Sequence, residues 1–397
     1  MEQLTILHTP EELALARQHC WDEYITDMNN NVEELAQFSS RLLLYGTVHM
    51  RFYLEKKGNP GPDGYPVYIA LHGGGQCPVP DMNDRQWLHQ HTYYFDSVTD
   101  GICIAPRGIR DTWNTHFNEE SFPLYDRLIM DLAAYENVDL NRVYLMGFSA
   151  GGDGVYGITP LMTDRFAAAN MSAGHPNYVD LTNLYNLPLE LQVGEEDGAY
   201  SRNRITANYG IYLDRLKRKF GDGFEHRVLI HHKKPHNFSD NERNRVPQTV
   251  LADYRKWLYD KDETTFETNT NAVDYVSRFT RNPLPRRVVW NLARRAGFRN
   301  VKSNYWLWAE HSASVGSVIA SYDRSDNSIT IEELTSSGVV KVLLNEDMLD
   351  VFSPITVRYP DHTEVVTVQP NLELLRSTTA ERGDRNYQFC ASITLNY

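Results

Sequence analysis

The sequence lacks several features that mark specialised classes of protein. It has four cysteines in 397 residues, Cys20, Cys77, Cys103 and Cys390, without metal-like spacing. Such sparse usage predicts free thiols in a reducing compartment, with the cytoplasm as the expected location. No apolar run approaches the roughly 20 residues that span a bilayer. The first ten residues carry no basic segment followed by an apolar stretch, so no secretory signal is expected.

Positive charge is also scarce. Lysine and arginine total 39 against 52 aspartates and glutamates, which gives a formal net charge of −13. A phosphate backbone would be repelled by such a surface, so nucleic acid is not an expected partner. The 41% of hydrophobic and 23% of charged residues are instead typical of a globular protein with a packed core.

The pattern of elements changes along the chain and predicts four regions. Residues 1–40 place apolar side chains at helical spacing and predict an N-terminal helical segment. Between 41 and 265, short apolar strands alternate with amphipathic helices, which predicts an α/β domain with a doubly wound, mostly parallel sheet. The Thr/Asn-rich start of 266–284 predicts a linker. Residues 285–397 then predict a smaller β-rich domain with one helix, around Leu372 to Arg382.

The first and last elements of the α/β region have distinct patterns. Leu42 to Leu54 is rich in β-branched and aromatic residues and predicts one strand. Val246 to Tyr259 has a helical pattern and predicts the final helix, after the strand Arg227 to His231.

The strongest chemical signal is a serine between glycines, directly after the apolar strand Val143 to Met146. Residues 147–151 read GFSAG. A strand-to-helix turn this tight would bring side chains at 147 and 151 into collision, so both must be glycine. The turn lifts the hydroxyl of Ser149 clear of the sheet, and the following helix directs its positive end toward the site. Ser149 is therefore predicted to be a nucleophile; the alternative is an ordinary turn with an incidental serine.

A second glycine cluster follows another buried strand, Val67 to Leu71. Residues 72–75 read HGGG. Because glycine has no Cβ, such a segment lets the backbone approach a ligand closely. The alternative is a merely flexible turn.

Together these two motifs resemble the α/β-hydrolase superfamily over residues 60–260, and most of all its esterase D, polyhydroxybutyrate depolymerase and prolyl-oligopeptidase-like branches. The resemblance implies an α/β-hydrolase fold with a serine nucleophile at an elbow. It also implies an oxyanion hole formed by the amide of Gly74 or Gly75 together with that of Ala150. The β-rich C-terminal region resembles appendages found on some bacterial members.

In this superfamily the chain order is serine, acid, histidine, so the partners of Ser149 should follow later strands. The strand Leu189 to Val193 precedes a glycine and three acids, of which Asp197 is the predicted orienting acid, with Glu195 and Glu196 as alternatives. The loop after the strand Arg227 to His231 contains His236, the predicted base. His231 and His232 still belong to the strand pattern.

Four further residues are predicted to bind substrate. His72 begins the glycine segment, and Arg107 and Trp113 belong to a loop that resembles the one lining the acyl or leaving-group side in those esterases. A bracing role is the alternative for Arg107, whose guanidinium could otherwise hold a carboxylate. His175 follows the strand after the elbow, where a pocket-lining or structural role is expected.

The sequence therefore predicts a serine hydrolase that acts through an acyl-enzyme on Ser149, with a carboxylesterase favoured and a small-molecule ester or short acylated compound as substrate. No metal, organic cofactor, nucleic acid or membrane partner is expected, and the oligomeric state is left open. The alternatives are a serine peptidase of prolyl-oligopeptidase-like type, or a silent hydrolase scaffold whose β domain binds a ligand.

Overall fold

The computed structural model describes residues 5–238, 247–259, 263–267, 269–295, 301–310 and 315–395. The chain divides into two compact units. Unit 1 comprises Met1–Ala36, Asp126–Glu136 and Asn282–Tyr397, and unit 2 comprises Gln37–Tyr125 and Asn137–Arg281. All four cysteines lie within the described residues and are free. No helix among the described residues is long and apolar enough to cross a membrane.

Unit 2 is built on a ten-stranded sheet in the order β1-β2-β4-β3-β5-β6-β7-β8-β9-β10. The strands are β1 (Leu42–Tyr45), β2 (Val48–Lys57), β3 (Tyr65–Leu71), β4 (Gly101–Pro106), β5 (Val138–Phe148), β6 (Ala168–Ser172), β7 (Leu189–Gly194), β8 (His226–His231), β9 (Gln248–Leu251) and β10 (Thr264–Glu267). Neighbouring strands from β4 to β8 pair in parallel, whereas the pairs at both ends of the sheet are antiparallel. The predicted mostly parallel sheet is confirmed.

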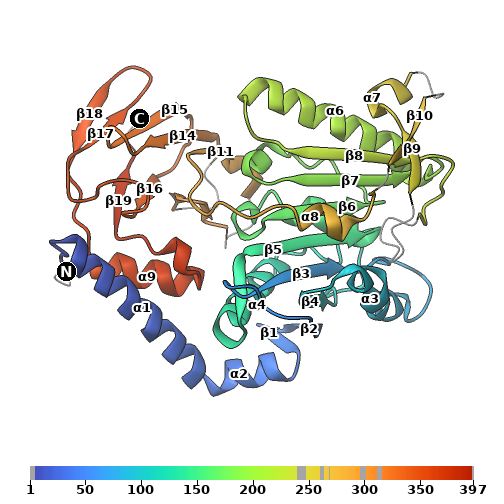
Figure 1. Ribbon diagram of the computed structural model, residues 1–397, viewed down its shortest axis with the longest axis horizontal. Coiled ribbons are helices and arrows are strands. Elements are labelled where there is room, and N and C mark those ends of the chain that lie inside the picture. The colour runs from blue at the N-terminus through green and yellow to red at the C-terminus, as the bar shows by residue number, and fades with distance from the viewer. Residues whose placement is uncertain are drawn as a thin grey trace. The chain divides into compact units, whose positions relative to one another are not determined.

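Helices cover both faces of this sheet (Figure 1). They are α3 (Met82–Tyr93), α5 (Ala150–Ile158), α6 (Arg202–Phe220), α7 (Tyr254–Trp257) and α8 (Ala272–Val276). Side chains of adjacent strand residues point to opposite faces. On β7, Gln192 reaches the carbonyl of Thr270 just before α8, while Val193 packs with Ala207 of α6. The fold is therefore doubly wound.

Two predicted elements in unit 2 are wrong. Leu42 to Leu54 forms not one strand but the hairpin β1–β2, because the chain turns at Gly46 with φ of 58°. The predicted helix from Val246 to Tyr259 is mostly strand: Gln248–Leu251 pairs antiparallel with Thr264–Glu267, and only the four residues of α7 are helical. Val246 itself lies outside the described residues. Sheet pairing with a distant segment overrides the local helical pattern here.

Unit 1 contains two smaller sheets, ordered β11-β14-β15-β17-β18 and β12-β13-β16-β19. Its strands are β11 (Arg287–Asn291), β12 (Ser303–Asn304), β13 (Leu307–Ala309), β14 (Ser317–Asp323), β15 (Ser328–Leu334), β16 (Val340–Leu344), β17 (Ile355–Arg358), β18 (Thr363–Val366) and β19 (Ala391–Thr394). Both sheets contribute to one apolar cluster that includes the buried Trp290 and Trp306. The predicted β-rich character of this region is confirmed.

The N-terminal helix belongs to the same unit. Helix α1 (Pro10–Asn30) packs against α9 (Leu372–Arg382), and Leu13 and Cys20 join the apolar cluster. The remaining helices, α2 (Val32–Ser39) and α4 (Ser121–Tyr135), continue from one unit into the other. The segment predicted as a linker, 266–284, includes the end of β10 and all of α8, both of which belong to unit 2.

Candidate functional site

Ser149 lies at a strained turn between β5 and α5. Its backbone has φ of 58° and ψ of −119°, angles that residues other than glycine rarely adopt. A Cβ at position 147 would lie 2.2 Å from the carbonyl oxygen of Gly151, and one at 151 would lie 2.0 Å from that of Leu71. Both distances are far below van der Waals contact. The flanking glycines are therefore required by the close approach of backbone segments, as the sequence predicts.

The structure brings Ser149, His236 and Asp197 together in one hydrogen-bonded row. The Oγ of Ser149 lies 3.0 Å from Nε2 of His236, and Nδ1 of His236 lies 2.7 Å from Oδ2 of Asp197. A carboxylate can only accept, so Nδ1 carries the hydrogen and donates a hydrogen bond to Asp197. Nε2 is thereby left free to accept from the serine hydroxyl. This is the arrangement in which an imidazole can act as a general base.

Asp197 follows β7 and His236 follows β8, so each comes from the loop beyond a parallel strand. Their two loops touch at Gly194, where a Cβ would lie 2.0 Å from the carbonyl oxygen of Pro235. Asp197 is 2% exposed, and its second oxygen, Oδ1, lies 3.7 Å from Nη1 of Arg202. A cation thus lies beside the buried carboxylate. No sequence pattern singled out Arg202, because its approach depends on the turn before α6.

The alternative acids and histidines have other partners. Glu195 accepts from the backbone N–H of Lys233 (2.9 Å) and from Nε1 of Trp257 (3.2 Å). Burial alone would raise the pKa of Glu195, but these hydrogen bonds outweigh it and the pKa lies below its ordinary value. His232 pairs with Glu195 (2.9 Å), and Glu196 is exposed. The contacts of Glu195 tie the loop after β7 to the segment after β8 and to α7.

His231 lies in the sheet and not at the reacting centre. Its Nε2 lies 2.7 Å from Oε1 of Gln192, and its ring stacks on Phe238 with 4.6 Å between centroids. Burial, with smaller contributions from Lys234 and Arg227, lowers the pKa of His231 to about 3, so the ring is neutral. A packed, neutral histidine thus supports the loop that contains His236, through its contact with Phe238.

The glycine segment approaches the elbow, and its second and third glycines differ in their hydrogen bonding. The N–H of Gly75 donates to Oδ1 of Asn83 (2.7 Å), and Nδ2 of Asn83 donates back to the carbonyl of Gly75 (2.8 Å). In contrast, the N–H groups of Gly74 and Ala150 have no hydrogen-bond acceptor within the described part of the chain. Of the two glycines that the resemblance implies as oxyanion donors, Gly75 is therefore already bonded and Gly74 is available. Asn83, on α3, was not predicted.

His72 braces the glycine segment and does not face a ligand, which corrects its prediction as a substrate-binding residue. It is 0% exposed, its Nδ1 donates to the carbonyl of Gly73 (2.7 Å), and its Nε2 accepts from the N–H of Gly108 (3.0 Å). Burial, together with the neighbouring His116, lowers the pKa of His72 well below its ordinary value. With both ring nitrogens bonded, the side chain ties two loops together.

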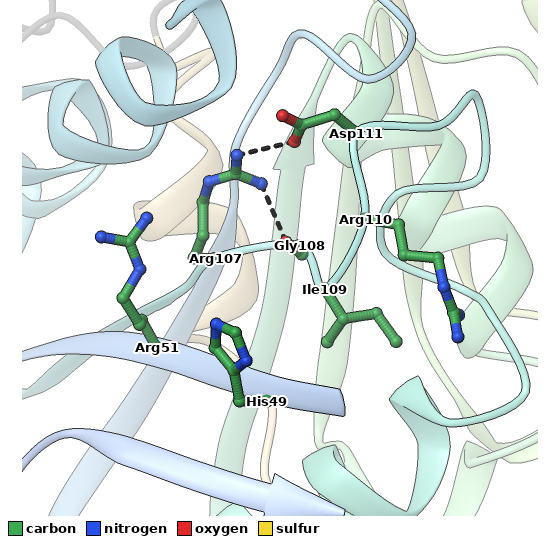
Figure 2. A pocket seen from close by; sticks show the side chains of 7 residues that line it. All are labelled: His49, Arg51, Arg107, Gly108, Ile109, Arg110 and Asp111. Atoms are coloured by element: carbon green, nitrogen blue, oxygen red, sulfur yellow. Dashed lines mark hydrogen bonds and ion pairs between the residues drawn. The ribbon is translucent and has the colours of Figure 1, made fainter. Parts of the chain in front are cut away.

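Arg107 also has a bracing role, which corrects the second of these predictions. Its guanidinium donates to Asp84 (3.0 Å), Asp111 (2.6 Å) and the carbonyl of Gly108 (2.8 Å), and Figure 2 shows the last two of these bonds. It lines a cavity of about 210 Å³ together with His49, Arg51, Gly108, Ile109, Arg110 and Asp111. The other two arginines there are paired as well, Arg51 with Asp84 and Arg110 with Glu120. The cavity therefore offers no unpaired guanidinium.

Trp113 and His175, the other two predicted substrate-binding residues, lie outside the cavity beside Ser149. Trp113 is 53% exposed and packs edge-on against Phe117. The backbone N–H of His175 donates to Oδ1 of Asp153 (2.6 Å), and its Nδ1 accepts from the N–H of Asn177 (3.1 Å). A role of either side chain in substrate binding stays a prediction.

The cavity that contains Ser149 has a volume of about 560 Å³, within the ~300–1,000 Å³ range usual for small-molecule sites. Its described lining consists of Gly73, Gly74, Cys77, Met82, Gln86, His89, Gln90, Tyr93, Phe148, Ser149, His236, Asn237 and Phe238. Five of these side chains come from α3, a helix that the sequence patterns did not predict. Among the described residues, no group of three or more His, Cys, Asp or Glu side chains could hold a metal ion.

No family model and no curated protein sequence matches the chain. Solved structures resemble about half of it: a thermostable esterase is 22% identical, with a TM-score of 0.37, over 49% of this chain and 55% of that one. An S-formylglutathione hydrolase from Staphylococcus aureus is 13% identical, with a TM-score of 0.34, over 49% of this chain and 88% of that one. A carboxylesterase from Bacillus cereus is 19% identical, with a TM-score of 0.36, over 52% of this chain and 92% of that one. The chain thus spans about half the length of the thermostable esterase.

Proposed function

We propose that this chain, whose larger unit has the α/β-hydrolase fold, is a serine hydrolase that cleaves carboxylic esters through an acyl-enzyme on Ser149. The observation that carries the proposal is the row of hydrogen bonds from Ser149 through His236 to Asp197, with distances of 3.0 and 2.7 Å. A serine hydroxyl is a poor nucleophile until a base takes its proton, and here a base of fixed tautomer lies within reach.

In the first half of the reaction, Oγ of Ser149 attacks the ester carbonyl as Nε2 of His236 takes its proton. The negative charge that develops on the carbonyl oxygen is held by the N–H groups of Gly74 and Ala150. Removing one such donor typically costs about 2.7–4 kcal/mol of transition-state stabilisation. His236 then gives the proton to the departing alcohol, and the acyl group stays on Ser149.

In the second half, water takes the place of the alcohol. His236 accepts a proton from the water as it attacks the acyl-enzyme, and returns that proton to Oγ of Ser149 as the acid leaves. Asp197 holds the imidazole in position and stabilises its protonated form. The 2% exposure of this carboxylate supports the role, because an interaction shielded from water is stronger.

The test is covalent labelling of Ser149 with a fluorophosphonate, together with hydrolysis of 4-nitrophenyl acetate and butyrate. Both should be lost in Ser149→Ala and kept in Ser40→Ala, which removes an exposed hydroxyl after α2. Aminoacyl 4-nitroanilides measured in parallel separate esterase from peptidase activity. Faster cleavage of the anilides would overturn the ester assignment, and an unlabelled wild-type protein would overturn the serine mechanism.

A further inference from the structure

One peptide unit of the glycine segment links the side chain of His72 to a proposed oxyanion donor. The carbonyl of Gly73 and the N–H of Gly74 belong to the same planar unit and point in opposite directions. Nδ1 of His72 donates to that carbonyl (2.7 Å), and a Cβ at position 73 would lie 3.4 Å from Cβ of Ser149. A hydrogen bond on the carbonyl side also polarises the N–H. His72 therefore sets both the direction and the strength of the donor at Gly74.

His72 is itself held on two sides by a single loop. Its Nε2 accepts from the N–H of Gly108 (3.0 Å), and its backbone carbonyl lies 2.8 Å from Nε2 of His116. The rings of the two histidines meet edge to face, with 4.5 Å between centroids. The loop closes on itself, since a Cβ at position 108 would lie 2.2 Å from Oγ1 of Thr115. Gly108 and His116 thus hold His72 as parts of one compact loop.

His116 has a defined tautomer. A backbone carbonyl can only accept, so Nε2 of His116 carries the hydrogen and donates to the carbonyl of His72. Burial lowers the pKa of His116 to about 4, so the ring is neutral at pH 7 and its Nδ1 is an acceptor. The hydroxyl of Tyr125 lies 3.4 Å from Nδ1 and is the donor to it. The hydrogen bonds therefore run in one direction, from Tyr125 through His116 to His72.

His116 also packs against the helix that carries the second proposed donor. A Cβ at position 154 of α5 would lie 2.8 Å from Cβ of His116, so glycine there allows the close approach. Helix α5 begins at Ala150, whose N–H is the other proposed oxyanion donor. His116 is 0% exposed and does not belong to the described lining of the cavity beside Ser149. It can affect the reaction only through the elements that it contacts.

We infer that His116 is a positioning residue for the oxyanion hole. It fixes His72, and through His72 the peptide unit that presents the N–H of Gly74. This inference rests on the proposed function, because its effect is on the same reaction. The oxyanion forms only as Ser149 attacks, so its donors stabilise the transition state more than the bound ester. Loss of His116 should therefore lower kcat and leave KM nearly unchanged.

Three variants test the inference by hydrolysis of 4-nitrophenyl butyrate. His116→Leu removes both hydrogen bonds and should lower kcat by about tenfold, less than the ~10²–10³-fold cost of deleting an oxyanion donor. His116→Gln keeps an N–H near the position of Nε2 and should recover most of that loss. Tyr125→Phe removes only a hydroxyl and serves as the test if His116→Leu does not fold. It should lower kcat by about threefold, the low end for one neutral hydrogen bond.

Propyl trifluoromethyl ketone gives a readout that a merely structural role would not move. Oγ of Ser149 adds to its carbonyl carbon, His236 takes the hydroxyl proton, and the electron pair of the C=O bond moves to the oxygen. That oxygen then occupies the place of the oxyanion. In each variant, the inhibition constant of the ketone should rise by the factor by which kcat/KM falls, because both report on the same donors.

His226→Leu is the matched control. Like His116, this imidazole is largely buried, with 7% of its side chain exposed. It bonds to a backbone carbonyl, that of Phe224 (2.7 Å), and lies near a tyrosine hydroxyl, that of Tyr254 (3.5 Å). His226 begins β8, whose other end leads to His236. Its removal should leave kcat and the inhibition constant of the ketone as in the wild type.

The outcomes separate this inference from the proposed function. Unchanged kcat in the His116 and Tyr125 variants, a loss confined to KM, or an equal loss in His226→Leu overturns the inference. So does a His116→Gln variant that is no more active than His116→Leu. Ester hydrolysis and labelling of Ser149 in the wild type would leave the proposed function intact in all these cases. If the wild type neither hydrolyses the ester nor is labelled, the proposed function fails and the inference fails with it.

Discussion

Two buried carboxyl groups, one in each unit, have different surroundings. Glu190 of unit 2 is 0% exposed and is bonded across neighbouring strands, since it accepts from Asn170 (2.9 Å) and Arg227 (2.7 Å). Asp131 of unit 1 is also 0% exposed, and its Oδ2 lies 3.8 Å from Nε of Arg127. Buried polarity in unit 2 holds strands and loops around the site. Changes to buried polar groups of unit 2 should alter activity or the loops that support the site, whereas changes at Asp131 should alter stability alone.

The largest expected effect is that of Asp197→Asn. An amide can donate to Nδ1, so it would favour the wrong imidazole tautomer and leave Nε2 unable to take the proton of Ser149. We expect kcat on 4-nitrophenyl butyrate to fall by about 10⁴-fold, with an unchanged melting curve. Glu196→Gln also replaces a carboxylate with an amide, but at the exposed position one residue earlier. This variant should keep nearly full activity. Equal losses in both variants would show that the loop and not the acid matters.

The next effect concerns Asn83, which holds the glycine segment without touching the reacting atoms. Asn83→Ala removes both bonds to Gly75, so Gly74 should lose its fixed position. We expect kcat to fall by about 10²-fold, the cost of a misplaced group, with little change in KM. Asn83→Asp can still accept from the N–H of Gly75 and should recover part of the loss. A change confined to KM would contradict a role in positioning the oxyanion donor.

A smaller effect is expected from the buried imidazole of unit 2. Burial lowers the pKa of His231 to about 3, below the ~6.5 of an unfolded histidine. The unfolded state therefore binds a proton first as the pH falls, and stability that is present above pH 6.5 is lost toward pH 3. The loss reaches about 2 kcal/mol at pH 5. Urea unfolding measures this loss as the drop in unfolding free energy between pH 7 and pH 5. In His231→Gln that drop should be smaller than in the wild type by about 2 kcal/mol, whereas exposed His49→Gln should show the same drop as the wild type.

The smallest effect, of opposite sign, is expected from Asp131 in unit 1. Burial, with repulsion from Glu34, raises the pKa of this carboxyl above its ordinary value, although Arg127 lowers it in part. The folded state then keeps a proton that the unfolded state releases above about pH 4, so stability falls as the pH rises. Asp131→Asn should be more stable than wild type by about 1 kcal/mol at pH 8, and equal to it near pH 4.

Activity per folded molecule should not change in Asp131→Asn, and exposed Asp27→Asn on α1 is the matched control for stability. If instead the wild type becomes more stable than Asp131→Asn as the pH rises, attraction to Arg127 outweighs burial, and the contrast between the two carboxyl groups fails.

The parts of the site that are encoded locally could be predicted from the sequence. The elbow and the glycine segment require particular residues at fixed spacing, and Asp197 and His236 follow strands in the order that the resemblance to the α/β-hydrolases implies. Helix α3 could not be found in this way, because its sequence, MNDRQWLHQHTY, is polar and shows no clear apolar face. Its importance arises from where the fold puts it, next to Ser149.

Residues with two chemically sensible roles could not be resolved from the sequence either. His72 and Arg107 are side chains that often bind substrates, and only their burial and their bonds to loop carbonyls and acids show that they are structural here. The same holds for α1, whose attachment to α9 joins residues far apart along the chain.

The contact between Gly194 and Pro235 sets how far apart the acid and the base lie. The two backbones meet there directly. The segment between them, which includes all of α6, could therefore become longer or shorter during evolution without separating Asp197 from His236. A single methyl group at position 194, by contrast, would wedge the two loops apart. The spacing of the proposed catalytic pair therefore depends on the absence of a side chain at position 194, whereas the length of the intervening segment can vary.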